Sequence, residues 1–242
     1  MTARLPGNRI QAHRGASATC PENTMAAFRA AHAAGAKSIE TDLTLLADGV
    51  FCLHHDRDLG RTVKGSGRIT DLDSSSVRAL DAGTWHNSGH DGEPVPLLGD
   101  ALAFQHETGI IFNWEIKDQG SVAIGDLARA VMTALQQADP ALTLVSSFSL
   151  PLLEALHAAG FHHKLALIAE ETPEGWAETG RRLGLEGFHL DADFLDSKAI
   201  TAMQESGFAT RIYTVNDAET FTRCAGLGID TIITDKPEEF IA

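Results

Sequence analysis

The feature that most constrains the fold of this chain is a unit that recurs along its length. Each copy consists of an amphipathic stretch of helical period, a glycine and then a short apolar run, as in LLEALHAAGFHHKLALIAE and RCAGLGIDTIITD. Glycine favours the left-handed conformation that ends many helices, and the apolar run after it is typical of a buried strand. Strands that alternate with helices pair in parallel through right-handed crossovers, so the repeat predicts an α/β fold.

The number of these units favours a (β/α)₈ TIM barrel. Eight strands are expected, at residues 9–14, 38–45, 110–117, 142–148, 164–170, 187–192, 210–215 and 231–235. The chain has 242 residues, a length that single barrels of this kind reach. An open, doubly wound sheet is the main alternative.

One region departs from the repeat. A ninth apolar run, residues 50–56, follows the second strand after only Leu-Ala-Asp-Gly, which is too short for a parallel crossover and predicts an antiparallel hairpin. Residues 57–100 then fit no strand–helix unit and are rich in Gly, Ser and Asp. We expect a single domain over residues 1–242 with this segment as an insertion, either a functional lid or a plain surface loop.

Composition narrows the class of protein. Acidic residues outnumber basic ones by 33 to 19, a formal net charge of −14, which argues against a nucleic-acid partner. No apolar run reaches the 18 or so residues of a membrane span, and the first residues lack the apolar core of a signal peptide. The three cysteines are scattered, so a disulfide framework is not expected. These features predict a cytoplasmic protein and leave its oligomeric state open.

Three carboxylates lie on the second and third predicted strands, on the faces expected to point into the barrel. Strand alternation places Glu40 and Asp42 on one face, and Glu115 on the polar face of the third strand with Asn113 and Lys117. In a barrel mouth of low dielectric, three such groups need compensation, and their oxygens suit a hard cation such as Mg²⁺ or Ca²⁺. The alternative is that they pair with lysine and arginine at a solvated barrel end.

Two histidines also stand at strand ends. His13 precedes Arg14, and His55 precedes an aspartate. Histidine titrates near neutrality, so a pair can supply a general acid and a general base, whereas a lone histidine here is more often structural. Arg14 and Lys117 add positive charge suited to a phosphoryl group.

These residues lie in segments that resemble the glycerophosphodiester phosphodiesterase family. The resemblance is carried by AHRGASATCPENTMAAFRAA, by IETDLTLLADGVFCLHHDRDLGRTVKGSG, and by the later FNWEIK, YTVN and GIDTIITDKP. The segments occur in the family's order almost from end to end of the chain. As a set they are highly specific, although His-Arg-Gly alone would mean little.

The resemblance implies a (β/α)₈ barrel that hydrolyses glycerophosphodiesters to glycerol 3-phosphate and an alcohol with one divalent cation, Mg²⁺ or Ca²⁺. It assigns general acid–base catalysis to two histidines, cation binding to three carboxylates and substrate contact to three further side chains. These are His13 and His55; Glu40, Asp42 and Glu115; and Arg14, Lys117 and Tyr213. Tyr213 stands where the family usually has tryptophan, so substrate preference is expected to differ.

Other interpretations remain beside this one. A lysophospholipase D or sphingomyelinase D-like activity on an acyl-bearing substrate is the nearest alternative, although the insertion is mostly polar. An amidohydrolase would need histidine where the chain has Gln11, and a non-catalytic module would be expected to lose a histidine or a carboxylate. His54 points away from His55 and is expected to be structural. His189 and Asp191 are either substrate contacts or polar packing in the barrel.

Overall fold

A closed barrel of eight parallel strands forms the centre of the computed structural model, which describes residues 4–86, 89–120 and 122–242. Its strands are β1 (Ile10–His13), β2 (Ser38–Leu45), β4 (Ile111–Ile116), β5 (Thr143–Ser147), β6 (Lys164–Ala169), β7 (Gly187–Asp191), β8 (Ala209–Tyr213) and β9 (Thr231–Thr234). β1 pairs in parallel with β2 on one side and with β9 on the other, which closes the sheet. The predicted barrel is confirmed, and the open sheet was wrong.

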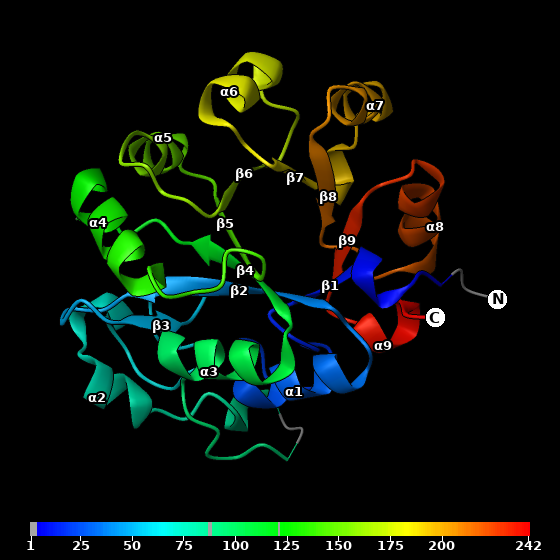
Figure 1. Ribbon diagram of the computed structural model, residues 1–242. Helices are drawn as coiled ribbons and strands as arrows, with labels where there is room; N and C mark the ends of the chain where they lie inside the picture. Colours follow the sequence, from blue (N-terminus) through cyan, green and yellow to red (C-terminus); the bar gives the residue numbers. More distant parts are fainter. Residues whose placement is uncertain (1–3, 87–88, 121) are drawn as a thin grey trace.

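Helices follow the strands and form an outer layer around them (Figure 1). They are α1 (Met25–Ala33), α3 (Leu98–Thr108), α4 (Ile124–Leu135), α5 (Leu150–Ala158), α6 (Trp176–Leu183), α7 (Ser197–Glu205), α8 (Ala218–Gly226) and α9 (Pro237–Phe240). Short 3₁₀ turns lie before β1 (η1, Gly7–Arg9) and after β7 (η4, Ala192–Phe194). Among the helices in the described ranges, none has the length and apolar character needed to cross a membrane.

Strand alternation separates the apolar and polar side chains as predicted. Phe112, Trp114 and Ile116 of β4 are buried in the main hydrophobic core, where the first two rings stack with centroids 4.4 Å apart. Asn113 faces the interior of the barrel instead, and its amide donates to Gln11 Oε1 of β1 at 3.3 Å. The polar positions of β1, β2 and β4 therefore point to the axis of the barrel.

The ninth run forms the predicted antiparallel hairpin. β3 (Phe51–Leu53) pairs with the end of β2, with Leu43 opposite Leu53. The segment after it contains η2 (Ile69–Asp71), α2 (Ser74–Arg78) and η3 (Thr84–His86), around a small apolar cluster of its own. That cluster consists of Leu46, Cys52, Val63, Ile69, Val77, Ala82 and Val95. The last residues of the expected insertion, 98–100, form the first turn of α3.

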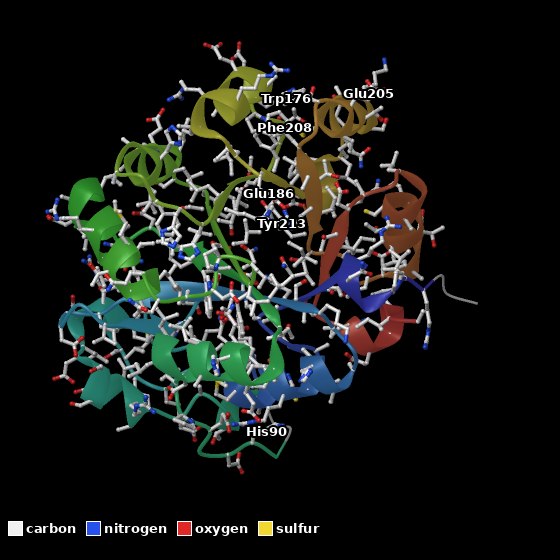
Figure 2. The ribbon with its side chains drawn as sticks, viewed as in Figure 1. His90, Trp176, Glu186, Glu205, Phe208 and Tyr213 are labelled. Atoms are coloured by element: carbon white, nitrogen blue, oxygen red, sulfur yellow. The ribbon has the colours of Figure 1, made fainter. Side chains whose placement is uncertain are left out.

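Aromatic rings pack between the helices and the strands on the side of the barrel formed by β7 and β8. Trp176 of α6 and Phe208, just before β8, lie together between the helices and the strands (Figure 2). With Phe188 of β7 they make mutual edge-to-face contacts, with ring centroids 5.3 to 6.0 Å apart. This packing holds β7 and β8, whose carboxyl ends carry Asp191 and Tyr213.

Gly187 provides a test of barrel packing. A Cβ at this position would lie 2.0 Å from the carbonyl oxygen of Ala209, its partner on β8. We expect Gly187→Ala to lower the free energy of unfolding by about 2–3 kcal/mol, because overpacking forces the strands apart. Urea denaturation measures this change.

Gly99→Ala is the matched control, because it lies in α3 with no heavy atom within 4 Å of the added Cβ. It should leave stability unchanged or raise it by about 0.5–1 kcal/mol through helix propensity. Wild-type stability of Gly187→Ala would contradict the packing described.

Candidate active site

The carboxyl ends of β1, β2 and β4 bring the predicted carboxylates together. The parallel register places His13 opposite Glu40, and Asp42 opposite Glu115. One oxygen from each of Glu40, Asp42 and Glu115 lies within 4.8 Å of the others, so the group can hold a metal ion. Glu40 and Asp42 are buried, and Glu115 is partly exposed at the mouth.

Basic side chains compensate part of this charge. Arg14 Nε lies 3.1 Å from Asp42 Oδ2, and Lys117 Nζ lies 3.3 Å from Asp42 Oδ1 and 2.5 Å from Glu115 Oε1. Burial opposes ionisation of Asp42, but the charges of Arg14 and Lys117 outweigh it and hold its pKa well below the usual range. The alternative of pairing with lysine and arginine is therefore realised for Asp42 and Glu115.

Glu40 is the carboxylate that these pairs leave undercompensated. Burial raises its pKa, and the negative charges of Asp42 and Glu115 raise it further. Its Oε2 accepts the backbone N–H of Arg14 at 3.2 Å, whereas Oε1 is buried with no hydrogen-bond partner in the described ranges. An unsatisfied buried oxygen beside two further carboxylates fits a hard divalent cation, which takes oxygen ligands.

His13 is held by a carboxylate from the last strand unit. Its Nδ1 lies 2.6 Å from Asp235 Oδ1, directly after β9, and its Nε2 lies 3.8 Å from Glu40 Oε2. Asp235 is itself fixed by Ser17 Oγ, which donates to Oδ1 at 2.9 Å, and by Asn216 Nδ2, which donates to Oδ2 at 2.5 Å. The ring therefore presents Nε2 to the carboxylate cluster.

His55 has a similar arrangement after the hairpin. Its Nδ1 lies 2.8 Å from Asp56 Oδ1, and Arg61 Nε donates to Asp56 Oδ2 at 2.6 Å. Burial opposes ionisation of Asp56, but hydrogen bonds from Arg61 and His55 lower its pKa to about 2. Arg61 also binds both oxygens of Glu22, whose Oε1 accepts from Arg14 Nη1 at 2.8 Å.

The supporting residues Asp235, Asp56, Glu22 and Arg61 were not predicted as site residues. Each lies in a segment that carried the family resemblance: TIITDKP, HHD, PENT and LGRT, respectively. Asp235 is also the last residue of the predicted strand 231–235, a position comparable to that of His13 near the end of the first strand. Contact between His13 and Asp235 spans 222 positions and could not be read from spacing.

Most predicted residues line one cavity of about 350 Å³ at the barrel mouth. Those lining it are His13, Arg14, His55, Glu115, Lys117 and Tyr213. Glu40 lies below them and lines a smaller cavity that it shares with His13, Glu115 and Tyr213. Asp42 is fully buried behind Arg14 and Lys117 and lines neither cavity.

The other two histidines of interest are buried. His54 Nδ1 accepts the N–H of Asp56 at 3.1 Å, and burial lowers the pKa of its ring to about 4, in keeping with a structural role. His189 is 1% exposed and lines the smaller cavity, where its Nε2 has no hydrogen-bond partner among the described residues. Burial and the charge of Arg211 lower the pKa of His189, so it is neutral.

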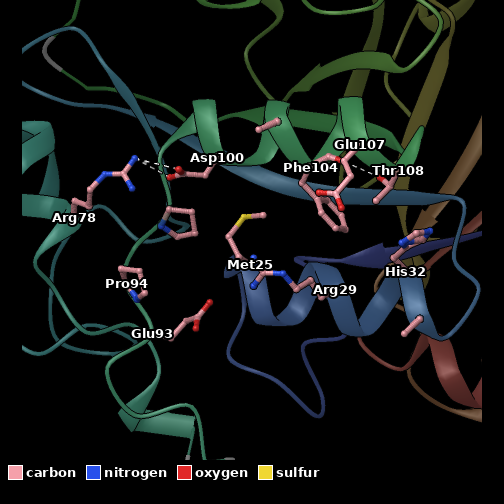
Figure 3. A pocket seen from close by; sticks show the side chains of 13 residues that line it. Met25, Arg29, His32, Arg78, Glu93, Pro94, Asp100, Phe104, Glu107 and Thr108 are labelled. Carbon is pink, nitrogen blue, oxygen red and sulfur yellow. Dashed lines mark hydrogen bonds and ion pairs between the residues drawn. The ribbon is translucent and has the colours of Figure 1, made fainter.

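A larger cavity, about 690 Å³, lies outside the barrel between α1, α3 and the insertion (Figure 3). Three of its ionic groups are engaged locally: Arg78 pairs with Asp100 at 3.0 Å, and Glu93 accepts the N–H of Ala26 at 3.0 Å. It shares no residue with the mouth cavity. The larger of the two cavities is therefore not the candidate active site, because the histidines and the carboxylate cluster meet at the barrel mouth.

Asp235→Asn tests the support of His13 through the pH dependence of stability. Burial opposes ionisation of Asp235, but hydrogen bonds from His13, Ser17 and Asn216, with the charge of His13, lower its pKa to about 2. A carboxyl group whose pKa falls on folding stabilises the protein above its unfolded pKa, near 3.8 here, and loses that contribution as the pH falls to about 2.

The wild type should therefore exceed Asp235→Asn in free energy of unfolding by about 1–2 kcal/mol near pH 5, and the difference should shrink from about pH 4 to pH 2. Urea titrations across this range measure it. Asp126→Asn, at an exposed position on α4, is the control. A difference that does not change with pH would contradict the stabilising role of the ionised Asp235.

Comparisons with known proteins agree with the resemblance. The sequence profile of the glycerophosphoryl diester phosphodiesterase family matches residues 13–239. A glycerophosphodiester phosphodiesterase of Caldanaerobacter subterraneus subsp. tengcongensis is 30% identical over 236 residues, which is 96% of each chain.

Among solved structures, a phosphodiesterase of Oleispira antarctica in complex with the product sn-glycerol-3-phosphate superimposes with a TM-score of 0.89. It is 28% identical, over 96% of this chain and 94% of its own. A glycerophosphodiester phosphodiesterase of Agrobacterium tumefaciens is 26% identical over 99% of both chains, with a TM-score of 0.79.

Proposed function

The chain belongs to the glycerophosphoryl diester phosphodiesterase family, and we propose that it uses His13 and His55 with a divalent cation to hydrolyse glycerophosphodiesters to glycerol 3-phosphate and an alcohol. The observation that supports this proposal most strongly is the set of side chains around the mouth cavity. The cavity is lined by two histidines, each with Nδ1 on a carboxylate, above a cluster of three acidic side chains.

The cation site is assigned to Glu40, Asp42 and Glu115. A divalent cation bound there would act as a Lewis acid that neutralises charge on the phosphate. The unsatisfied Oε1 of Glu40 and the raised pKa of its carboxyl group support this assignment, because both indicate too little positive charge around it. Mg²⁺ and Ca²⁺ both suit an all-oxygen ligand set.

Arg14 and Lys117 are assigned to the phosphate. Both line the mouth cavity and keep their charge beside the carboxylates, so they provide local positive potential in a chain whose net charge is −14. An anionic substrate approaching such a protein needs that local compensation. The guanidinium of Arg14 also offers several N–H donors in a plane that matches phosphate oxygens.

The two histidines are assigned to proton transfer. A carboxylate on Nδ1 favours the tautomer with hydrogen on that nitrogen, which leaves Nε2 free to accept or return a proton. One histidine takes the proton of the nucleophile, which is water or a neighbouring substrate hydroxyl, and the other protonates the leaving alkoxide. Because both rings are held in the same way, the orientation of the substrate decides which is the acid.

An acyl-bearing substrate, as in a lysophospholipase D or sphingomyelinase D-like reaction, is the second candidate. The observation in its favour is that Phe148 and Phe194 are each 51% exposed in the loops after β5 and β7. Turnover of lysophosphatidylcholine compared with glycerophosphocholine distinguishes the two candidates. We further propose a cytoplasmic location, which the three free, buried cysteines support.

His13→Ala and His55→Ala are each expected to lower kcat for glycerophosphocholine by about 10²–10⁴, since each removes a proton-transfer group. Circular dichroism and urea unfolding should show that the fold is retained. His106→Ala, at an exposed histidine on α3, should keep wild-type turnover. Turnover close to wild type in His13→Ala would rule out the assigned role.

Removal of divalent cations is expected to abolish hydrolysis, and addition of Mg²⁺ or Ca²⁺ to restore it. Glu40→Gln should raise the cation concentration needed for half-maximal activity about tenfold or more, because one anionic ligand is lost. Glu107→Gln, an exposed change of the same type on α3, should not alter it. Full activity in excess chelator would contradict the assignment of a cation.

A further inference from the structure

The mouth cavity has two chemically different halves. One half holds the histidines and basic side chains assigned to catalysis and phosphate binding. The other half is lined by Phe148 after β5, Asp191 and Asp193 at the end of β7, and Tyr213 at the end of β8. Because the two halves are continuous, a diester bound at its phosphate reaches the second half with one of its substituents.

Taken together, the loops that follow β5, β6, β7 and β8 are acidic, and two carboxylates of this region, Asp191 and Asp193, line the cavity. The loops after β5, β6, β7 and β8 are residues 148–149, 170–175, 192–196 and 214–217, all within the described ranges. They contain no Lys, Arg or His, and their acidic residues are Glu170, Glu171, Glu174, Asp193, Asp196 and Asp217. The last two also cap α7 and α8. In contrast, the half that faces β1 and β4 presents Arg14 and Lys117.

Two aromatic rings form the wall between these acidic groups. Phe148 is 51% exposed, and its ring meets that of Tyr213 edge to face with centroids 6.2 Å apart. Burial raises the pKa of Tyr213, and the charges of Asp191, Glu115 and Glu170 raise it further. The tyrosine ring thus lies in a negative field, and an aromatic face in such a field attracts a cation.

The floor below this wall also points to a ligand. The smaller cavity is lined by Phe148 and Tyr213 and also by His189, whose buried Nε2 has no partner in the described part of the chain. A buried polar atom of this kind is normally satisfied by water or by a bound molecule. A polar group of the substrate that occupied the smaller cavity would lie beside it.

We propose that this acidic and aromatic half binds the alcohol portion of the substrate and selects one that carries a positive charge. A quaternary ammonium or a protonated amine fits, as in the choline and ethanolamine esters of glycerol phosphate. The inference rests on the proposed function and adds the chemical class of the substrate to it. The positions of charge agree: the phosphate faces Arg14 and Lys117, and the cation faces Asp191 and Asp193.

An uncharged apolar group would fit the same wall less well. Phe148 offers it contact area, but the carboxylates of Asp191 and Asp193 would lose hydration beside it without gaining a partner. A cation compensates that loss directly. The comparison that isolates charge from shape is therefore between choline and its carbon analogue.

The experiment uses the full chain, loaded with Mg²⁺ or Ca²⁺, and two esters. One is glycerophosphocholine, and the other is the ester in which a tert-butyl group replaces the trimethylammonium group. We expect the wild type to prefer the choline ester by about tenfold in kcat/KM, the range of a partly desolvated cation on aromatic and acidic groups. Asp193→Asn should reduce this ratio by at least about threefold, because it removes one rim charge.

Asp191→Asn is a second variant, in which the Oδ1 acceptor used by the Asp193 N–H can remain. It should also lower the ratio. Glu205→Gln makes a change of charge at the outer end of α7 (Figure 2) and should leave the ratio unchanged.

Equal kcat/KM for the two esters in the wild type would overturn the inference and leave the proposed function standing. A ratio that survives in both aspartate variants would overturn it as well. Failure of the cation-loaded wild type to hydrolyse either ester would instead overturn the proposed function itself.

Discussion

Repulsion between Asp42 and Glu115 is the constraint on which the architecture of the barrel mouth depends. The β2–β4 register places these residues directly opposite each other. Glu40, two residues before Asp42 on β2, adds a third carboxylate. Removing one partner from a buried ion pair typically lowers the stability of the folded protein by about 3–5 kcal/mol. The basic side chains that compensate these acids are therefore needed as much as the acids themselves. Arg14 and Lys117 come from the ends of β1 and β4 to meet this need.

The chain makes local conformational adjustments to bring those groups in. Arg14 and Asn23 both have positive φ, near 56°, and the side chain of Asn23 donates to Asp42 Oδ2 at 2.7 Å. Gly15, with φ of 88°, lies so close to α1 that a Cβ would be 2.6 Å from that of Ala27. The absence of a side chain at Gly15 thus permits α1 to pack closely against the loop after β1.

Ion pairs extend this compensation to His55, one of the two histidines to which proton transfer is assigned. Arg14 shares Glu22 with Arg61, and Arg61 in turn binds Asp56, which holds His55. The hairpin histidine and the carboxylate cluster therefore belong to one charged network. Each member of this network is in direct contact with the next one. A change in the protonation of one side chain therefore alters the electrostatic potential at the others.

The barrel and the central residues of the site could be predicted because both follow from strand periodicity. His13 ends β1 and Glu115 lies near the end of β4, and the parallel register places Glu40 and Asp42 of β2 beside them. The contact of His13 with Asp235 depends on closure between the first and last strands, which spacing does not express. In the acidic half of the cavity, Tyr213 and Asp191 were named from the sequence, whereas Phe148 and Asp193 were not, because Asp193 lies in the irregular segment after β7 and Phe148 was taken as part of a strand.

The hairpin also determines how the insertion is attached. The chain leaves β3 just after Leu53 and returns beside it, since the Leu53 N–H donates to the Pro96 carbonyl at 2.9 Å and Cys52 pairs with Leu97. His55 sits at the start of this closed loop, where the backbone N–H of His54 donates to the carbonyl of Asp42. Lengthening or shortening an exposed turn of this loop, such as residues 64–68, changes mainly the closure entropy, which depends weakly on length. The attachment of the insertion therefore separates Arg61, which supports His55 through Asp56, from the more distant turns, and only those turns can be remodelled without disturbing the histidine.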